Sequence, residues 1–506
     1  MNSITARPPS SVFRVRLVTF KSFVVLWAVV GTVSCTAEEL SAPSAPQAAA
    51  LRVDRPDVTI CHVPASSPAI LVVSMAALRA HEAHGDYVAR LEVGDGSASN
   101  DGVHFARISD ALAAARATRI AHDELENAAC RVTIVVSAGV RPATTRPTID
   151  PAIEQLPFII DVPDITIRGA LQMQVDETGR ATGLGNATGT TTIAPSPALI
   201  IVGGIGSTSG APEPIFIVNA HPVGSKGHGA VIEGFTLQSG RLPSDPQIGG
   251  FGVFALRVNG LVVRGNRFDG GLSSGADLRA SHATVERNYL SGRGGSCDIC
   301  LAGPGAYVAR DNRMIGGGVP GVLILPTVLL GVLPSVEQYE LPTSAIVTAD
   351  IVNNEVRDHR REPVGVGLRI GAVGVGAPNV AGLTKVKLTD NLLVNNTFGI
   401  IVEAGFPRAA TLLRGDIELT TSGNVILASC QRDLLVSLAS SQTGLGIQAG
   451  PYLLRSSYAL MLGGDLSWPA AWYSHPAGFG NTLTVNGAVI PNGVQRAYDP
   501  ARVCPS

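Results

Sequence analysis

Short apolar strands that end in asparagine recur along the second half of the chain. The segments are VVRGNRFDGG, TVERNYLSG, YVARDNRMIGG, DIVNNEVRD, KLTDNLLVNN and ELTTSGNVIL, with asparagines at Asn266, Asn288, Asn312, Asn354, Asn391 and Asn424. The first two intervals are 22 and 24 residues, which suits one coil of a solenoid, and the longer later intervals suit coils that bear a loop. The pattern therefore predicts a stacked array rather than separate domains.

The residues of each segment explain why the strands must stack. Val, Ile and Leu alternate with polar residues over a few positions, so each strand is too short to be stable alone and must pair one coil away. Asparagine tolerates the left-handed backbone conformation of a tight corner, where stacked side chains can bond to one another. The leucine spacing and helix of a leucine-rich repeat are missing, and a propeller blade would need rungs of about twice this length.

These segments resemble the right-handed parallel β-helix of the pectate-lyase-like superfamily. Gly275–Arg279 and Gly399–Glu403 resemble first strands of a coil, and Ile108–Arg116 followed by Val132–Gly139 resembles the helix and opening strand of such domains, with Ser109 able to cap the helix. The resemblance spans about residues 105–490. The predicted fold is all-β: a right-handed parallel β-helix solenoid with an N-terminal capping helix and a small α+β N-terminal module.

The start of the chain is typical of an export signal. Residues 1–34 contain four basic and no acidic residues, an apolar run over Phe23–Val30 and small residues before Cys35. The small residue before Cys35 resembles a bacterial lipobox, which implies that Cys35 becomes lipidated, although Thr32 departs from the usual Leu, Val or Ile. We expect a signal peptide at 1–34, a lipid-anchor tether at 35–50, a Cys/His module at 51–100, the solenoid at 101–490 and a tail at 491–506. The expected location is the bacterial cell surface or periplasm, or the medium if Cys35 stays free.

The net charge of the chain limits the classes of partner that we expect. Loss of residues 1–34 takes the formal charge from −2 to −6, and no basic patch with interleaved aromatic residues is present. We therefore expect no nucleic-acid partner, and membrane contact through the N-terminal lipid alone. The remaining partners are a polysaccharide or a surface protein, and the sequence leaves the oligomeric state open.

Six cysteines remain if Cys35 is lipidated, and an even number in an exported chain favours disulfides. Their order alone does not decide among the fifteen pairings of six cysteines. The pairing that we expect joins Cys297 to Cys300, Cys430 to Cys504 and Cys61 to Cys130.

Residues 58–87 resemble a short module of unknown function in bacterial exported proteins. Cys61, His62 and Pro64 match its start, and the end His-x-x-His-Gly-Asp runs from His81 through His84 to Asp86. Ser74 can cap a helix that places His81 and His84 on one face. Zinc accepts the ligand types His62, His81, His84 and Asp86. Because the spacing matches no recognised zinc pattern, we favour histidines that cap the end of the helix and pack the Cys-His turn, and we expect little or no bound metal.

Catalysis in β-helix enzymes that the chain resembles takes place along the first strands of the coils, with carboxylates that hold calcium and an Arg or Lys base, or with clustered Asp. The candidate first strands are 253–258, 276–280, 297–301, 322–325, 366–370, 400–403 and 434–437. Arg257 and Arg279 fall at equivalent places in two of them, and we expect Asp277 and Asp298 to do so too. Their side chains would then stack on one sheet face. The register at 297–301 is ambiguous by two residues, and charged surface pairs are the alternative.

The sequence favours a surface protein that binds a glycan or protein partner without catalysis, because outward carboxylates are sparse. The alternative is a polysaccharide lyase, epimerase or glycoside hydrolase that acts on an acidic polysaccharide, with Asp277, Arg279, Asp298 and Arg257 as its site. The charge run at 358–362 is interpreted as a solvated turn.

Overall fold

The computed structural model describes much of the chain beyond residue 56. The described residues are 57–63, 68–94, 101–121, 130–144, 150, 152–185, 189–195, 215–219, 228–238, 251–270, 272, 274–292, 297–317, 320–326, 344–360, 365–371, 381–403, 405–408, 411–414, 416–427, 432–437, 454–463, 471–472, 482–485 and 488–490. The predicted signal peptide and tether, with Cys35, lie outside them, as do Cys430, Cys504 and the tail. Within the described part, no helix has the length and apolar character needed to cross a membrane.

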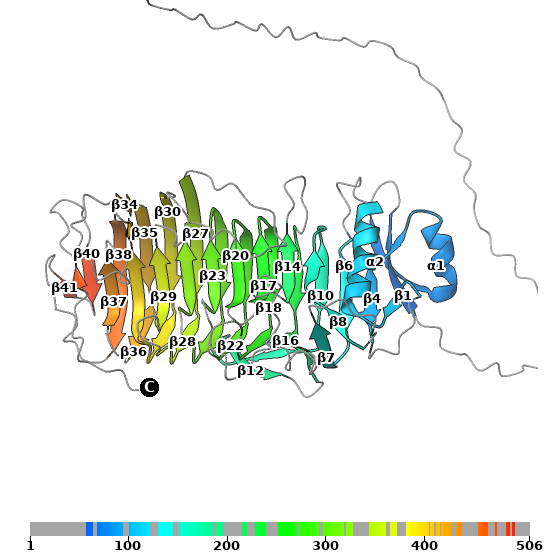
Figure 1. Cartoon of the computed structure of the whole chain (residues 1–506), viewed down its shortest axis with the longest axis horizontal. Coiled ribbons are helices and arrows are strands. Elements are labelled where there is room, and N and C mark those ends of the chain that lie inside the picture. Colours follow the sequence, from blue (N-terminus) through cyan, green and yellow to red (C-terminus); the bar gives the residue numbers. More distant parts are fainter. Residues whose placement is uncertain are drawn as a thin grey trace, which may run out of the picture. The chain divides into compact units, whose positions relative to one another are not determined.

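The described residues lie in one compact unit, Arg55–Ser506, most of which is a right-handed parallel β-helix whose coils stack in a row (Figure 1). Each full coil contributes one strand to each of three parallel sheets, which we call sheets I, II and III. Sheet I contains β4 (Arg90–Val93), β6 (Val132–Val136), β10 (Ile165–Arg168), β15 (Val231–Glu233), β18 (Asn259–Arg264), β21 (His282–Glu286), β24 (Gly305–Arg310), β27 (Ser344–Val352), β30 (Ala381–Thr389), β35 (Asp416–Ser422), β38 (Leu454–Gly463) and β40 (Thr482–Val485).

Sheet II follows sheet I around each asparagine corner. Its strands are β7 (Gly139–Thr144), β13 (Thr191–Pro195), β16 (Phe235–Gln238), β19 (Arg267–Asp269), β22 (Tyr289–Ser291), β25 (Arg313–Ile315), β28 (Glu355–Arg357), β31 (Leu392–Val394) and β36 (Asn424–Leu427), and the long β38 pairs with β36 as well as with β35. Short strands complete the edges: β5 (His104–Phe105) on β4, β8 (Glu154–Gln155) on β7, and β41 (Ala488–Ile490) antiparallel to β40.

Sheet III contains the first strands that the sequence predicted. It runs through β9 (Phe158–Ile160), β14 (Phe216–Asn219), β17 (Phe251–Leu256), β20 (Ser274–Arg279), β23 (Ile299–Ala302), β26 (Val322–Leu325), β29 (Val366–Gly371), β32 (Phe398–Glu403), β37 (Arg432–Ser437) and β39 (Ala471–Trp472). After β32, a small antiparallel hairpin is formed by β33 (Gly405–Arg408) and β34 (Thr411–Arg414). All seven first strands expected from the sequence lie in sheet III.

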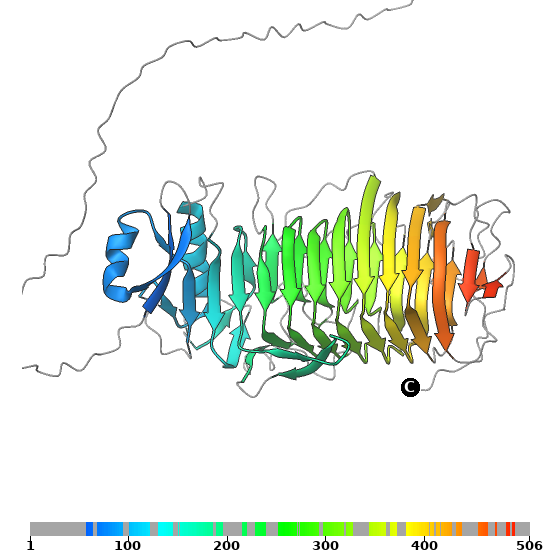
Figure 2. The same ribbon diagram turned by 180° about the vertical axis from the view of Figure 1, so that it is seen from behind.

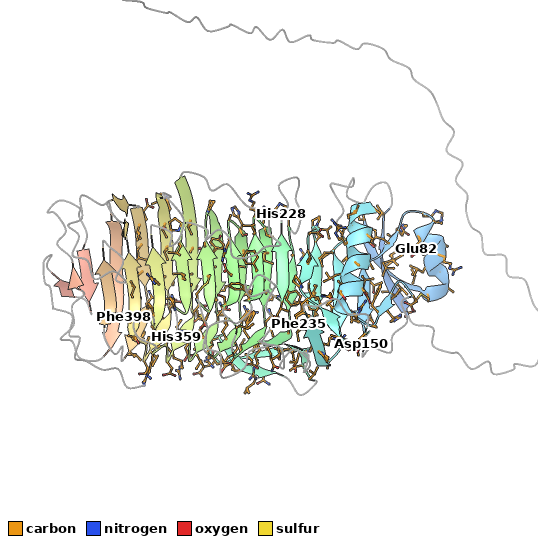
Figure 3. All side chains as sticks on the ribbon, in the orientation of Figure 1. Glu82, Asp150, His228, Phe235, His359 and Phe398 are labelled. Carbon is orange, nitrogen blue, oxygen red and sulfur yellow. A yellow bond between two sulfur atoms is a disulfide. The ribbon has the colours of Figure 1, made fainter. Side chains whose placement is uncertain are left out.

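The core is filled by columns of apolar side chains, one from each coil. In sheet III one such column runs through Val253, Ala276, Ile299, Val322, Leu368 and Ile400, all fully buried. Near the first coils this column continues through Phe216 and Phe158. Phe235 of sheet II, labelled in Figure 3, packs against Phe216 with ring centroids 5.6 Å apart. Alternation along each strand thus sets which side chains face the core and which face outward.

The asparagine ladder sits at the corner between sheets I and II. The residue before each ladder asparagine, from Gly265 to Gly423, has a φ between 52° and 64°, so the chain turns there in the left-handed conformation. The side-chain Nδ2 of Asn288 donates to the carbonyl of Val263 at 2.9 Å and to Oδ1 of Asn312 at 3.1 Å, while its Oδ1 accepts from the backbone N–H of Asn266 at 3.0 Å. The same bonds repeat to Asn424, and the predicted asparagine corner is confirmed.

Helix α2 (Ile108–Ala121) covers the core at the N-terminal end of the solenoid through Ile108, Ala111, Leu112 and Ala115. Its cap differs from the sequence prediction. Because α2 begins at Ile108, Ser109 lies inside the first turn, and its Oγ has no hydrogen-bond partner among the described residues. The backbone N–H of Ile108 instead donates to both oxygens of buried Glu154, 3.0 and 2.9 Å away. Burial raises the pKa of Glu154, although the Arg141 guanidinium 3.0 Å away acts against that rise.

The N-terminal module is an antiparallel sheet joined to a short helix. Its strands are β1 (Asp57–His62), β2 (Ala69–Ser74) and β3 (Tyr87–Val88), with α1 (Met75–Glu82) after β2. Ser74 has the extended conformation of an N-cap residue but makes no side-chain capping bond, so the predicted cap is backbone geometry alone. The module continues into the solenoid, because Ala89 bonds to Thr59 on one side and to Thr133 on the other.

A hairpin runs across the coils near the asparagine corner. It is formed by β11 (Met173–Val175) and β12 (Ala181–Gly185), and Figure 2 shows it along one edge of the solenoid. At its tip, Arg180 donates to the carbonyls of Asn353 at 3.0 Å and Asp390 at 3.1 Å. Arg313 pairs with Asp176 at 2.5 Å. The hairpin therefore contacts coils that are formed by much later parts of the sequence.

Candidate functional site

Asp277 and Arg279 lie on the outward face of sheet III, two residues apart on β20. The guanidinium of Arg279 donates to Oδ1 of Asp277 at 2.9 Å and to Oδ2 at 2.7 Å, a bidentate pair. It also lies over the ring of Phe254, 5.1 Å from the centroid. Both charged residues are buried, at 3% and 5% exposure, so this pair is not a solvated surface pair. Because both oxygens of Asp277 accept from Arg279, this carboxylate is poorly placed to act as a free acid or base.

The expected stacking of the other two candidates is wrong. Arg257 aligns with Ala280, one position past Arg279, because the backbone N–H of Arg257 bonds to the carbonyl of Arg279. Asp277 aligns with Cys300 rather than with Asp298. The reason is the core: Ile299 takes the buried column under Ala276, which leaves Asp298 just before the start of β23.

Asp298 instead meets a histidine from a later coil. Its Oδ2 lies 3.2 Å from Nε2 of His359, a residue labelled in Figure 3. His359 is fully buried, and its backbone N–H donates to Oδ1 of Asn396 at 3.0 Å. The predicted solvated turn at 358–362 is therefore wrong at His359. This Nε2 atom makes no hydrogen bond among the described residues, so the two side chains would have to realign before a proton could pass between them. The buried carboxylate and imidazole are a second candidate for acid–base chemistry.

Two of the three expected disulfides are present. Cys61 bonds to Cys130 and Cys297 to Cys300. The hydroxyl of Ser274 lies 3.7 and 3.5 Å from the two sulfurs of the second bridge, beside the Asp298 turn. The third pair, Cys430 with Cys504, lies outside the described residues.

A cationic cavity of about 400 Å³ lies between the hairpin base and the corner of sheet I. Its charged lining is Arg168, Arg264, Arg287 and Glu233. Arg168 and Arg264 both bind the carboxylate of Glu233 from the neighbouring coils. Gly234 in the wall has a φ of +77°, and a Cβ there would lie 2.6 Å from the carbonyl oxygen of Gly169, so the corner needs glycine. Three guanidinium groups against one carboxylate leave the cavity with a net positive charge.

Arg287 is the free cation of this cavity. Its side chain is exposed and makes no hydrogen bond or ion pair with the residues that the structure describes. The sequence analysis missed these arginines. The signal was available, because Arg264 ends a sheet I strand two residues before the ladder asparagine Asn266, and Arg287 directly precedes the ladder asparagine Asn288. What the sequence does not show is that the hairpin base closes over this end of the strands.

His62, His81 and Asp86 meet in the N-terminal module. The Nδ1 atoms of His62 and His81 lie 2.8 and 2.7 Å from the same oxygen, Oδ2 of Asp86, and Oδ1 accepts from the backbone N–H of Val63 at 2.9 Å. Three atoms suited to a metal ion, one from each of the three side chains, lie within 4.8 Å of one another. The predicted fourth member, His84, is not part of this group; it lies beyond the end of α1.

The charge state of Asp86 follows from its partners. Burial acts to raise its pKa, but the hydrogen bonds from His62, Val63 and His81 outweigh burial and lower the pKa from 3.8 to about 2. Asp86 is therefore a carboxylate at neutral pH. Because its pKa is lower in the folded state, this network stabilises the fold above about pH 4, and that contribution is lost as the pH falls towards 2.

Comparison with known proteins supports no assignment beyond the fold. No protein-family model matches the sequence, and no curated protein sequence does either. Similar solved structures include a family 28 exopolygalacturonase from Yersinia enterocolitica, with 11% identity and a TM-score of 0.39 over 80% of this chain and 70% of that one. A mannuronan C-5 epimerase A-module from Azotobacter vinelandii gives 12% and 0.32 over 78% and 98%. A GH87 α-1,3-glucanase from Streptomyces thermodiastaticus gives 13% and 0.34 over 78% and 61%.

Proposed function

We propose that this protein recognises an acidic polysaccharide, and that the cationic cavity of Arg168, Arg264 and Arg287 is a binding subsite. The observation that supports this proposal is Arg287, an exposed guanidinium without a partner among the described residues, next to two further arginines that share one carboxylate. A planar guanidinium matches a uronate carboxylate with two parallel hydrogen bonds.

The cavity has the charge and the neighbourhood that such a ligand needs. The predicted mature chain is acidic, so a local excess of guanidinium groups is a distinct feature of this surface. Arg287 is positioned by its own backbone, since its left-handed φ of 52° belongs to the repeated corner. A repeating anionic polymer would bind here through one sugar, and its other residues would extend over the adjoining surface.

Replacing Arg287 with alanine is expected to weaken binding of polygalacturonate or mannuronan oligomers at least about tenfold, the loss of one charge-assisted contact. Isothermal titration at low salt measures this, and affinity should fall as salt is added. Arg79→Ala is the matched control, because Arg79 is an exposed arginine on α1, outside the cavity. Equal affinity of the wild type and Arg287→Ala would rule out the cavity as the subsite.

Catalysis is the second candidate, and the buried Asp298–His359 contact favours it. The enzymes named above, a polygalacturonase, a mannuronan epimerase and an α-1,3-glucanase, agree with this alternative at the level of fold alone. The bidentate use of Asp277 by Arg279 favours binding without turnover. The same oligomers distinguish the two: products that are lost in Asp298→Asn, at an unchanged melting temperature, would identify an enzyme.

We also propose that the protein is exported and lipid-anchored through Cys35. The support is the signal-like segment 1–34 and the small residue before Cys35. Labelled palmitate should enter the wild type, and Cys35→Ser should appear in the soluble fraction without label. Identical membrane release of the two forms would contradict the anchor.

A further inference from the structure

We infer that His62, His81 and Asp86 form a site for a divalent transition metal such as Zn²⁺. The three side chains come from three different segments: the end of β1, the last turn of α1 and the turn after α1. Both imidazoles direct Nδ1 at a single atom, Oδ2 of Asp86, at distances of 2.8 and 2.7 Å, and the three ligand atoms lie within 4.8 Å of one another. Two imidazoles and a carboxylate are three of the four ligands of a tetrahedral zinc site, with water as the fourth.

The geometry needs little change to admit the ion. At Zn–N and Zn–O distances of about 2.0–2.2 Å, ligand atoms in a tetrahedral site are about 3.3 Å apart. The Nδ1 to Oδ2 distances of 2.8 and 2.7 Å would have to open by about 0.5 Å, which a side-chain rotation supplies. Each neutral imidazole keeps its proton, which moves from Nδ1 to Nε2 when the metal binds at Nδ1. The ligand set is also suitable, because Asp86 offers a carboxylate oxygen beside two imidazole nitrogens.

The site is also held in place and reachable. Gly85, at a φ of +88°, makes the turn that brings Asp86 under the two imidazoles, and the Cys61–Cys130 disulfide fixes β1 one residue before His62. The side chain of Asp86 is 1% exposed, whereas the side chains of His62 and His81 are 38% and 28% exposed. The carboxylate is therefore buried beneath imidazoles that solvent and an ion can approach. A ligand set fixed before the ion arrives loses less entropy on binding.

The competing interpretation, favoured by the sequence, is a purely structural network in which the histidines cap the end of the helix and pack the Cys-His turn. It accounts for hydrogen bonds to His81, which lies in the last turn of α1. It also places His62, at the end of β1, in the packed Cys-His turn, but it does not require His62 and His81 to direct Nδ1 at the same oxygen of Asp86. The two rings also stand edge to face, 6.0 Å apart, and so approach the oxygen from two directions.

Titration of the metal-free full-length protein with ZnCl₂ tests the site. We expect one ion per chain in the wild type, a rise in melting temperature on loading, and at least about a tenfold loss of affinity in His62→Ala and in His81→Ala. His84→Ala is the matched control, since His84 lies three residues from His81 but outside the cluster, and it should bind zinc like the wild type. His81→Gln, which keeps the size and polarity of the side chain, separates a loss of ligand from a loss of fold, and circular dichroism checks the fold of each variant.

Two results would overturn the site. One is a wild type that takes up no zinc and shows no thermal shift. The other is binding that persists in His62→Ala and His81→Ala, or that falls equally in His84→Ala, which would place the ion elsewhere. None of these measurements depends on glycan recognition, so the metal site and the proposed function are tested independently of each other.

Discussion

Replacing Asn312 with alanine is expected to lower the free energy of unfolding by about 3 kcal/mol or more, the sum of several buried groups left without partners. Its Oδ1 accepts from the backbone and side-chain nitrogens of Asn288, 3.0 and 3.1 Å away, and its Nδ2 donates to Val285 and Asn354. No water can replace these bonds easily, because Asn312 is fully buried. Chemical denaturation, followed by circular dichroism, measures the loss.

The matched control for the ladder is Asn259→Ala. Asn259 is an exposed asparagine at the start of β18, and its change should stay within about 0.5 kcal/mol. A loss below about 1 kcal/mol in Asn312→Ala would mean that the ladder contributes little beyond its backbone turns.

Removal of Arg279 is expected to cost about 3–5 kcal/mol, because Asp277 would remain as a buried charge without its partner. The double variant Asp277→Ala with Arg279→Ala should lose clearly less than the sum of the single variants, since it removes both charges together. Thermal or urea unfolding of all four proteins gives this coupling. Arg90→Ala, in the exposed pair of Arg90 with Glu92, is the control and should cost less than about 1 kcal/mol. Additive losses would show that the two side chains act independently.

This experiment also bears on function. If Arg279→Ala destabilises the protein so strongly, any loss of glycan recognition in that variant reports folding rather than chemistry. Arg287 and Asp298 are better probes. Arg287 has no partner among the described residues, and Asp298→Asn keeps the shape of the side chain beside His359.

The fold could be predicted because its signals are local. Each asparagine, its left-handed neighbour and the short alternating strands fall within about ten consecutive residues, and a one-coil repeat then fixes the stacking direction. The disulfide between Cys297 and Cys300 could be predicted for the same reason, because the two cysteines are three residues apart in the sequence. Prediction of the Cys61–Cys130 disulfide required the further assumption that the N-terminal module lies against the start of the solenoid.

The candidate site depended on contacts that no local pattern contains. Asp298 does not align with Asp277 because Ile299 is the residue of β23 that packs in the core opposite Ala276. This packing fixes the register of residues 297–301, which the sequence left ambiguous by two residues. Its partner, His359, arrives from a corner two coils later along the chain. Similarly, His62 and His81 could be placed near one another from the sequence, but their meeting at one oxygen of Asp86 depends on how α1 packs against β1.

The hairpin of β11 and β12 changes how this solenoid should come apart. In an array where each coil touches its neighbours alone, stability is a sum of nearest-neighbour terms, and the array can fray coil by coil. Here Arg180 donates to carbonyls that lie 173 and 210 residues further along the chain. The hairpin therefore links coils that are not neighbours, from outside the solenoid. We therefore expect the coils between the base and the tip of the hairpin to unfold together. Under a force applied along the solenoid axis, they should not separate one coil at a time.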